Sequence, residues 1–153
     1  MHWMILPLKR YFDFSGRSRR MEFWMFVLFT TLVAAVLAGP IVLDIMAAAM
    51  ADPLSVEADP LAGMGTFGAI GISLYGLFFL AILIPSIAVT VRRLHDRDMS
   101  GWWYLGFIVA SFIPLLGLIA SIAFIVVMFL PGTEGANRFG LDPKDPHGAE
   151  VFE

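Results

Sequence analysis

The sequence RRLHDRDMSGWW, residues 92–103, decides the fold because it separates two long apolar runs. Its first seven residues include three arginines, two aspartates and a histidine. The 31 residues before it (61–91) contain no charged side chain, and neither do the 30 residues from Gly101 to Leu130. About 20 apolar residues in a helix cross a hydrocarbon core. Residues 92–100, called the polar island below, are therefore predicted to lie at a membrane surface between two buried segments.

The composition supports a membrane protein. Of the 153 residues, 59% are hydrophobic and only 15% are charged, whereas about 25% of the residues of a typical soluble domain are charged. The net charge of −3 gives no overall basic field that would attract nucleic acid. The chain has no cysteine, which excludes disulfides, thiolate metal sites and cysteine nucleophiles.

The charge-free runs predict an all-α integral membrane protein, a small bundle of three transmembrane helices. The spans are expected at 23–43, 70–91 and 101–130, within a transmembrane domain of residues 23–130. Residues 1–22 are predicted to form a cytoplasmic interfacial segment, and residues 131–153 a polar tail of turns and disorder. The first run is longer than a signal-peptide core, which favours an uncleaved anchor. Gly65, Ala69 and Ser73 are spaced four apart and predict a stripe of close helix contact.

The third run allows two interpretations. A single helix of 30 residues would be about 45 Å long, more than a bilayer core requires. Pro114 and Gly117 interrupt its middle. We predict one long helix kinked at Pro114, with a re-entrant or helical hairpin, giving four segments, as the alternative.

Basic residues set the predicted orientation. The first 22 residues contain five Lys or Arg, residues 44–60 contain four acids and no base, and the polar island contains three arginines. Lys and Arg are concentrated in the cytoplasmic loops of membrane proteins. The N-terminus and the island are therefore expected on the cytoplasmic side. The side of the tail depends on whether residues 101–130 cross the membrane.

Three motifs resemble a known family. They are FSGRSRRMEFW (residues 14–24), RRLHD with SGWW (92–96 and 100–103), and GANRFG (135–140). Their order around the apolar runs is similar to that of the small bacterial inner-membrane proteins catalogued as domain of unknown function 805, from about Tyr11 to Pro143. The resemblance implies a bacterial inner (plasma) membrane location. It supplies no catalytic residues, since no biochemical activity is established for the family.

The candidate ligand or interface residues lie in these three motifs. They are Arg17, Arg20, Glu22, Arg92, Arg93, His95, Asp96, Ser100, Gly101, Trp102, Asn137 and Arg138. Asp96 is predicted to be the counter-charge of Arg92 and Arg93, its i,i+4 and i,i+3 neighbours on a continued helix. Glu22 is favoured at a helix N-terminus, or could pair with an arginine of the island. The tryptophans are expected at interface depth. If the tail returns to the cytoplasmic side, residues 137–140 could close over the island.

Little in the sequence predicts catalysis. His95 beside Asp96 could act as an acid and base, but no further histidine has metal-ligand spacing. We expect no catalytic residue, no metal and no cofactor. The leading hypothesis is a non-enzymatic membrane protein whose arginine-rich face binds anionic lipid, or a partner, either a second copy or another membrane protein. The alternatives are a subunit of an oligomeric transporter or channel, and an interfacial enzyme that acts on lipid headgroups with His95 and Asp96.

Overall fold

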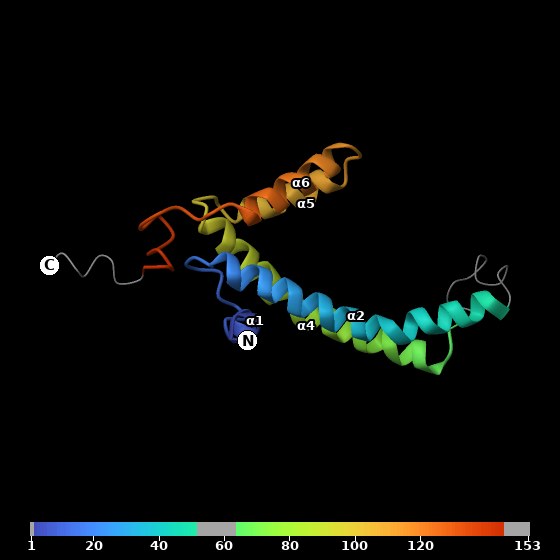
Figure 1. Ribbon diagram of the computed structural model, residues 1–153. Coiled ribbons are helices and arrows are strands. Elements are labelled where there is room, and N and C mark those ends of the chain that lie inside the picture. The colour runs from blue at the N-terminus through green and yellow to red at the C-terminus, as the bar shows by residue number, and fades with distance from the viewer. Residues whose placement is uncertain (1, 52–63, 146–153) are drawn as a thin grey trace. The chain divides into compact units, whose positions relative to one another are not determined.

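A computed structural model describes residues 2–51 and 64–145, and its regular elements there are all helices. In chain order they are α1 (His2–Lys9), α2 (Arg20–Ala51), α4 (Thr66–His95), α5 (Trp102–Ser111) and α6 (Leu116–Phe129) (Figure 1). The predicted all-α fold class is confirmed. The predicted acidic loop at 52–60 and the end of the tail, 146–153, lie outside the described residues.

The two longest helices, α2 and α4, are the candidate membrane spans. They contain 32 and 30 residues, and only 6% and 11% of their most apolar windows are buried inside the protein. Their apolar surface is therefore not the covered core of a soluble domain. Both helices extend beyond the predicted spans. α2 continues through Asp44 to Ala51, and α4 continues past Val91 to His95, so the first arginines of the island belong to its last turn.

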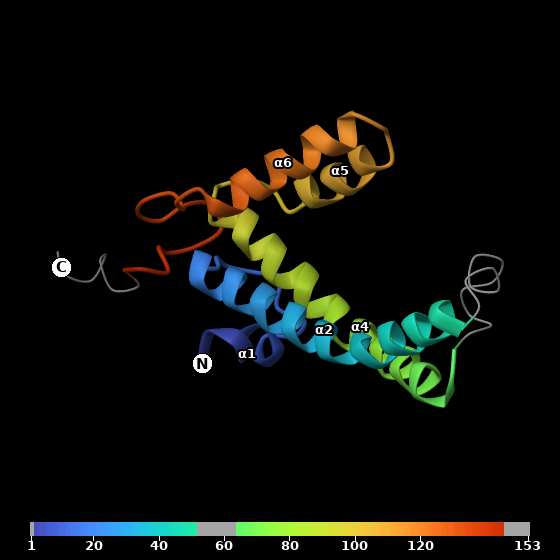
Figure 2. The same cartoon turned by 45° about the vertical axis from the view of Figure 1, so that its right-hand side comes forward.

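The prediction of one long helix at 101–130 is wrong, and the hairpin alternative is confirmed. α5 and α6 are separate helices that pack against each other, joined by a tight turn (Figure 2). Pro114 lacks an N–H and disfavours helical geometry at the residue before it. Leu115 follows with φ of 64°, and a Cβ on Gly117 would lie 2.8 Å from the Ser111 carbonyl oxygen. The chain thus reverses direction where a kink was expected.

The described residues fall into two compact units, residues 28–83 and the remainder. In residues 28–83, glycines of α4 meet α2. A Cβ on Gly68 would lie 2.7 Å from Asp44 Oδ2, and one on Gly71 would lie 3.1 Å from Ile41 Cγ1. Ala69 and Ser73 are exposed. Of the predicted stripe, Gly65 lies against Asp44 of α2, where a Cβ would be 3.0 Å from Oδ2, and contact through Ala69 and Ser73 stays a prediction.

Asp44 explains the glycines at the start of α4. Its Oδ2 accepts a hydrogen bond of 2.7 Å from the backbone N–H of Gly68. The first turn of a helix has N–H groups without intrahelical partners, and a carboxylate satisfies them and interacts well with the helix dipole. A side chain on Gly68 would displace this carboxylate. The glycines at the start of α4 therefore permit a close contact with α2 of the same chain.

The unit formed by residues 1–27 and 84–153 has an unusual core. Its largest fully buried side chains are those of Arg92 and Arg93, followed by Phe26 and Leu94. Buried arginines are uncommon unless they are paired. Their partners define the candidate site.

Candidate functional site

The site is built around Arg92 and Arg93 at the C-terminal end of α4. The relative exposure of both residues is 0%. The last carbonyls of a helix lack intrahelical partners, and cations are stabilised near them. The sequence therefore places these arginines favourably at a helix end. The tertiary structure buries them.

Asp96 is shared by two arginines. Arg93 Nη1 donates to Asp96 Oδ2, and Arg17 Nε donates to Asp96 Oδ1 over 3.0 Å. The three side chains are at most 5% exposed. The predicted Arg93–Asp96 pair is confirmed, and Arg17 joins it from 79 residues away in the sequence.

Arg92 does not pair with Asp96, so that part of the prediction is wrong. Its Nη2 donates to Glu22 Oε1 over 2.9 Å, and this pair is also buried. Its Nη1 donates to the backbone carbonyl of Asp13. The alternative in which Glu22 pairs with an arginine of the island is therefore confirmed. Arg17, Glu22, Arg92, Arg93 and Asp96 are called the ion-pair network below.

The network also caps the C-terminal end of α6. Arg93 donates to the carbonyls of Met128, at 3.2 and 3.3 Å, and of Leu130. Arg20 Nη1 donates to the carbonyl of Phe129 over 3.3 Å, although its side chain is otherwise exposed. Guanidinium groups at a helix C-terminus satisfy its unpaired carbonyls. The arginines thereby connect the end of the α5–α6 hairpin to the end of α4.

The tail folds back onto the same site. Arg17 donates to the carbonyls of Thr133, at 2.5 Å, and Gly135, at 2.6 Å. The backbone N–H of Thr133 donates to the Asp96 carbonyl over 2.8 Å. Asn137 Nδ2 donates to the His95 carbonyl over 2.9 Å. The prediction that residues 137–140 close over the island is confirmed, and residues 131–145 are ordered by these bonds where disorder was expected.

Gly132 allows this close approach. A Cβ built at this position would overlap the carboxylate of Asp96. Any larger residue would have to displace a carboxylate that two guanidinium groups hold. Sequence analysis missed both Gly132 and Thr133, because a Gly-Thr pair in a polar tail is equally typical of an ordinary turn.

His95 lies at the outer edge of the network. Its Nδ1 is 3.2 Å from the Gly16 carbonyl oxygen, and its ring stacks on Phe139 with centroids 3.9 Å apart. Arg138 covers the ring of Phe139 at 4.8 Å and pairs with Asp98 over 3.1 Å. That pair is exposed, with 60% and 48% of the side chains accessible. Sequence analysis named His95 and Arg138 but not Phe139 between them.

The Ser-Gly-Trp sequence at residues 100–102, where the polar island ends, lies apart from the ion pairs. Ser100 Oγ accepts a hydrogen bond of 3.4 Å from the Trp102 N–H, at the start of α5. A Cβ on Gly101 would lie 2.8 Å from Val91 Cγ1, so glycine permits α5 to begin against α4. Trp102 is 77% exposed. Ser100, Gly101, Trp102 and His95 line a groove of about 610 Å³.

Asp13 supports the N-terminal side of the network. Hydrogen bonds from the Ser15 hydroxyl and from Arg10 outweigh the effect of burial and lower the pKa of Asp13 to about 2. Asp13 is therefore a carboxylate at neutral pH, and the backbone carbonyl of the same residue accepts from Arg92. The Arg10–Asp13 pair is local, with the residues three apart, and neither this pair nor its link to Arg92 was predicted from the sequence.

The arrangement provides few groups for catalysis. Both Asp96 oxygens accept from buried arginines, and His95 Nδ1 faces a carbonyl, so the two residues do not form a His–Asp dyad. In residues 2–51 and 64–145, no three His, Asp or Glu side chains are grouped as metal ligands would be. The chemistry that the site does show is mutual neutralisation of buried charge.

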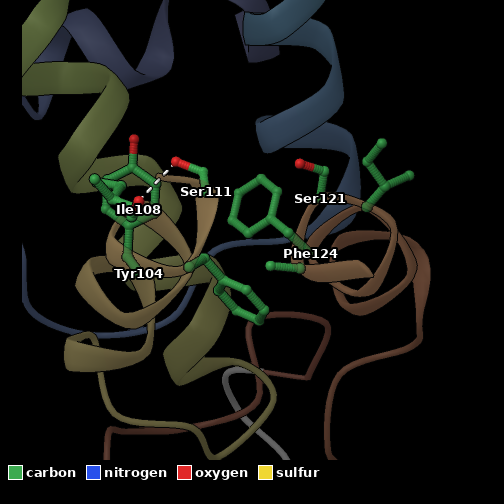
Figure 3. Close-up of a pocket in the computed structure, with 8 residues that line it drawn as sticks. Tyr104, Ile108, Ser111, Ser121 and Phe124 are labelled. Atoms are coloured by element: carbon green, nitrogen blue, oxygen red, sulfur yellow. Dashed lines mark hydrogen bonds between the residues drawn. The ribbon is translucent and has the colours of Figure 1, made fainter. Parts of the chain in front are cut away.

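A second, smaller pocket lies within the hairpin. Its volume is about 260 Å³, and its walls come from both α5 and α6 (Figure 3). Ser111 Oγ donates to the Ile108 carbonyl over 2.6 Å, so this hydroxyl is satisfied within its own helix. Ser121 Oγ likewise donates to the Gly117 carbonyl over 2.8 Å. The pocket is otherwise apolar and aromatic, and it contains no residue that the sequence predicted as a site.

Comparison with known proteins identifies the family. Residues 11–141 match the model of the protein family of unknown function DUF805. The chain belongs to this family. It is 36% identical to the inner membrane protein YhaI of Escherichia coli K12 over 144 residues, covering 94% of this chain and 97% of YhaI. It is also 36% identical to the inner membrane protein YhaH over 146 residues, covering 94% of this chain and 98% of YhaH.

A more distant relative, the uncharacterised protein YiiR of the same organism, is 29% identical over 155 residues, covering 88% of each chain. No solved structure matches the chain. The DUF805 match begins at Tyr11 and ends at Leu141. It therefore includes all three elements that meet in the ion-pair network, namely the start of α2, the end of α4 and the residues after α6.

Proposed function

We propose that this DUF805 protein is a multi-pass protein of the bacterial inner membrane, without catalytic activity, whose cytoplasmic face binds anionic lipid headgroups. The observation that carries the proposal is the division of its arginines. Arg17, Arg92 and Arg93 are buried and paired within the protein, whereas Arg20 and Arg138 are exposed beside them. The buried arginines build the face. Arg20 donates to the Phe129 carbonyl and Arg138 pairs with Asp98, but both guanidinium groups remain at the surface, within reach of a headgroup.

The hairpin geometry supports a cytoplasmic tail. α5 has 10 residues and α6 has 14, or about 15 and 21 Å at 1.5 Å per residue, less than the ~30 Å of a hydrocarbon core. Their exposed apolar side chains nevertheless require cover by lipid. A re-entrant hairpin meets both conditions and returns the tail to the side of the island, where Asn137 binds it. The five basic residues of the N-terminal segment favour the cytoplasmic side for this face.

A topology measurement tests the first part. Reporter domains fused after residue 51 and after residue 145 should report opposite sides of the membrane, with the second fusion cytoplasmic. A periplasmic signal from the fusion after residue 145 would contradict the re-entrant hairpin and would leave no route by which the tail reaches the island.

Lipid binding depends on the exposed charges. Each Lys or Arg near an anionic leaflet contributes about 1 kcal/mol of attraction, which salt weakens. The Arg92 and Arg93 side chains are enclosed, so a substitution there would test folding and not lipid binding. The informative variant is Arg20→Gln with Arg138→Gln, and the matched control is Arg20→Lys with Arg138→Lys, which keeps both charges.

The measurement is the ratio of phosphatidylglycerol to phosphatidylethanolamine that purified protein retains after extraction in mild detergent at low salt. We expect the Gln pair to lower this ratio and the Lys pair to retain it. An unchanged ratio in the Gln pair would overturn the lipid proposal and favour a protein partner for the same face.

A further inference from the structure

The groove that contains His95 and Ser100 changes character along its length. At one end it is lined by His95, Ser100 and Trp102, which belong to the polar island and the start of α5. At the other end it is lined by Ile87, Leu105 and Ile108. From Ile87 to His95 the helix rises about 12 Å at 1.5 Å per residue. The groove therefore runs from the polar boundary of α4 toward its charge-free part.

The polar end has one donor and one acceptor suited to an oxygen-rich group. Nδ1 of His95 faces the Gly16 carbonyl at 3.2 Å, and a carbonyl can only accept, so Nδ1 carries a proton and the neutral ring has its acceptor at Nε2. Burial lowers the pKa of His95 below its ordinary value of 6.5, so at neutral pH Nε2 remains an acceptor, suited to a glycerol hydroxyl. Ser100 Oγ accepts from the Trp102 N–H, which leaves its own O–H to donate. A phosphate ester or a glycerol hydroxyl matches these groups.

The charges around the polar end complement an anion. The carboxylate of Asp96 is fully engaged by Arg17 and Arg93. The exposed carboxylate of Asp98 is neutralised by Arg138, whose guanidinium lies over the Phe139 ring that stacks on His95. No unpaired carboxylate of the described residues thus lines this groove. An anionic headgroup would meet a neutral-to-positive rim.

We propose that this groove is a binding site for a single glycerophospholipid, with an acyl chain along Ile87, Leu105 and Ile108 and the phosphate region at His95 and Ser100. The inference rests on the membrane location in the proposed function. The two proposals differ in where the lipid is held. The exposed arginines select a headgroup by its charge, whereas the groove holds an acyl chain by burying it. A volume of about 610 Å³ lies within the 300–1,000 Å³ of small-molecule sites.

The first test fills the groove. Leu105→Trp adds volume to its apolar wall, and Leu118→Trp is the matched control, since Leu118 is 63% exposed on α6 and lines neither pocket. Each protein is purified in mild detergent, and bound phospholipid is counted by native mass spectrometry. We expect about one phospholipid per chain to survive in the wild type and in Leu118→Trp, and at least a fivefold lower occupancy in Leu105→Trp. Equal occupancy in both variants would overturn the proposal.

A second test does not depend on the folding of the Leu105 variant. In a chain with Trp3, Trp24 and Trp103 replaced by Phe, Trp102 is the remaining tryptophan and lines the groove. Phosphatidylglycerol brominated on its acyl chains should quench Trp102 in nanodiscs, and the quenching should persist at 0.5 M salt. Adding Ser100→Val and His95→Phe should weaken it. Unchanged quenching in that variant would show that the polar end holds no headgroup.

The two proposals fail in different ways. Loss of the phosphatidylglycerol preference in Arg20→Gln with Arg138→Gln, with bound lipid still counted at one per chain, supports both. An unchanged preference in that variant together with loss of bound lipid in Leu105→Trp would reject the charged face and keep the groove.

Discussion

The ion-pair network and the apolar helices differ in what they bury: the network buries charged side chains, whereas the apolar helices leave most of their side chains exposed. In the described residues, the buried polar or charged side chains are Arg17, Ser18, Glu22, Thr90, Arg92, Arg93 and Asp96, as many as the buried hydrophobic ones. Along α2 and α4, the most apolar windows are almost entirely exposed. The difference follows from the solvent on each side. Apolar side chains are stable when they are exposed to lipid. Charged side chains at the membrane surface are stabilised when they pair with one another.

This comparison also explains why the ion pairs are shared. A buried carboxylate or guanidinium loses its hydration, and a single partner repays that cost only with good geometry and further hydrogen bonds. Here each network arginine also donates to backbone carbonyls, such as those of Asp13, Met128 and Thr133. The charges thereby join three chain segments that are far apart in the sequence.

The largest expected effect comes from removing the shared carboxylate. Asp96→Asn leaves Arg17 and Arg93 buried without a counter-charge, and breaking a buried pair in this way costs about 3–5 kcal/mol. Asp98→Asn is the matched control, since the exposed Arg138–Asp98 pair contributes only ~0–1 kcal/mol. The free energies of unfolding are compared in mixed micelles. Similar losses in both variants would show that burial in the network does not determine stability.

A somewhat smaller effect is expected from coupling within the second pair. Glu22→Leu and Arg92→Met each leave one buried charge unpaired, whereas the double variant leaves none. Contacting residues of this kind couple by about 0.5–3 kcal/mol, so the double variant should be more stable than the sum of the single losses predicts. A double-mutant cycle measures this difference. Strict additivity would mean that Glu22 and Arg92 do not interact.

Glycine contacts in the apolar helices should be worth less than the ion pairs. In Gly68→Ala the new methyl group would press against Asp44 Oδ2, and overpacking of this kind costs about 1–3 kcal/mol. Gly76→Ala is the control on the same helix, because a Cβ there has no neighbour within 4 Å. It should leave stability unchanged or raise it by up to ~1 kcal/mol. Equal losses would place the effect in the helix backbone and not in the contact with Asp44.

The smallest effect concerns Asp13, whose side chain is about one-third exposed. Its folded pKa, about 2, lies below the ordinary value of 3.8. The folded state therefore favours the carboxylate, and the resulting stability is present above pH 3.8 and lost as the pH falls toward 2. The melting temperature of Asp13→Asn should be lower than that of the wild type at pH 6. The two melting temperatures should converge near pH 2, and a gap of constant size would contradict this origin.

Much of the site was predictable because its residues are local in sequence. Arg93 and Asp96 are three apart on a helix, and that spacing alone predicts their pair. The error at Arg92 has the same origin. Asp96 is its i,i+4 neighbour, but Glu22, 70 residues away, presents a carboxylate at 2.9 Å. Phe139 was predicted over the island only as part of residues 137–140 and not as a site residue, and Gly132 was missed, because stacking and close approach leave no periodic pattern in a tail.

The hairpin shows a similar limit. Pro114 and Gly117 predicted a break in the third run, but these residues are compatible with both a kinked helix and a reversal of the chain. The choice was made by Leu115 at φ of 64° and by the packing of Gly117 on the backbone of Ser111.

The sequence by itself determined the class of the molecule, since charge-free runs of this length have no stable alternative to helices in an apolar solvent. It also predicted that the N-terminal segment and the polar island lie on one side of the membrane. Only the tertiary structure decided which charges pair, that Arg92 and Arg93 are enclosed, and that the tail completes the network. The reason is that a hydropathy pattern indicates only whether each segment lies in lipid or in water. The partner of a buried charge depends on distances between segments that are far apart in the chain.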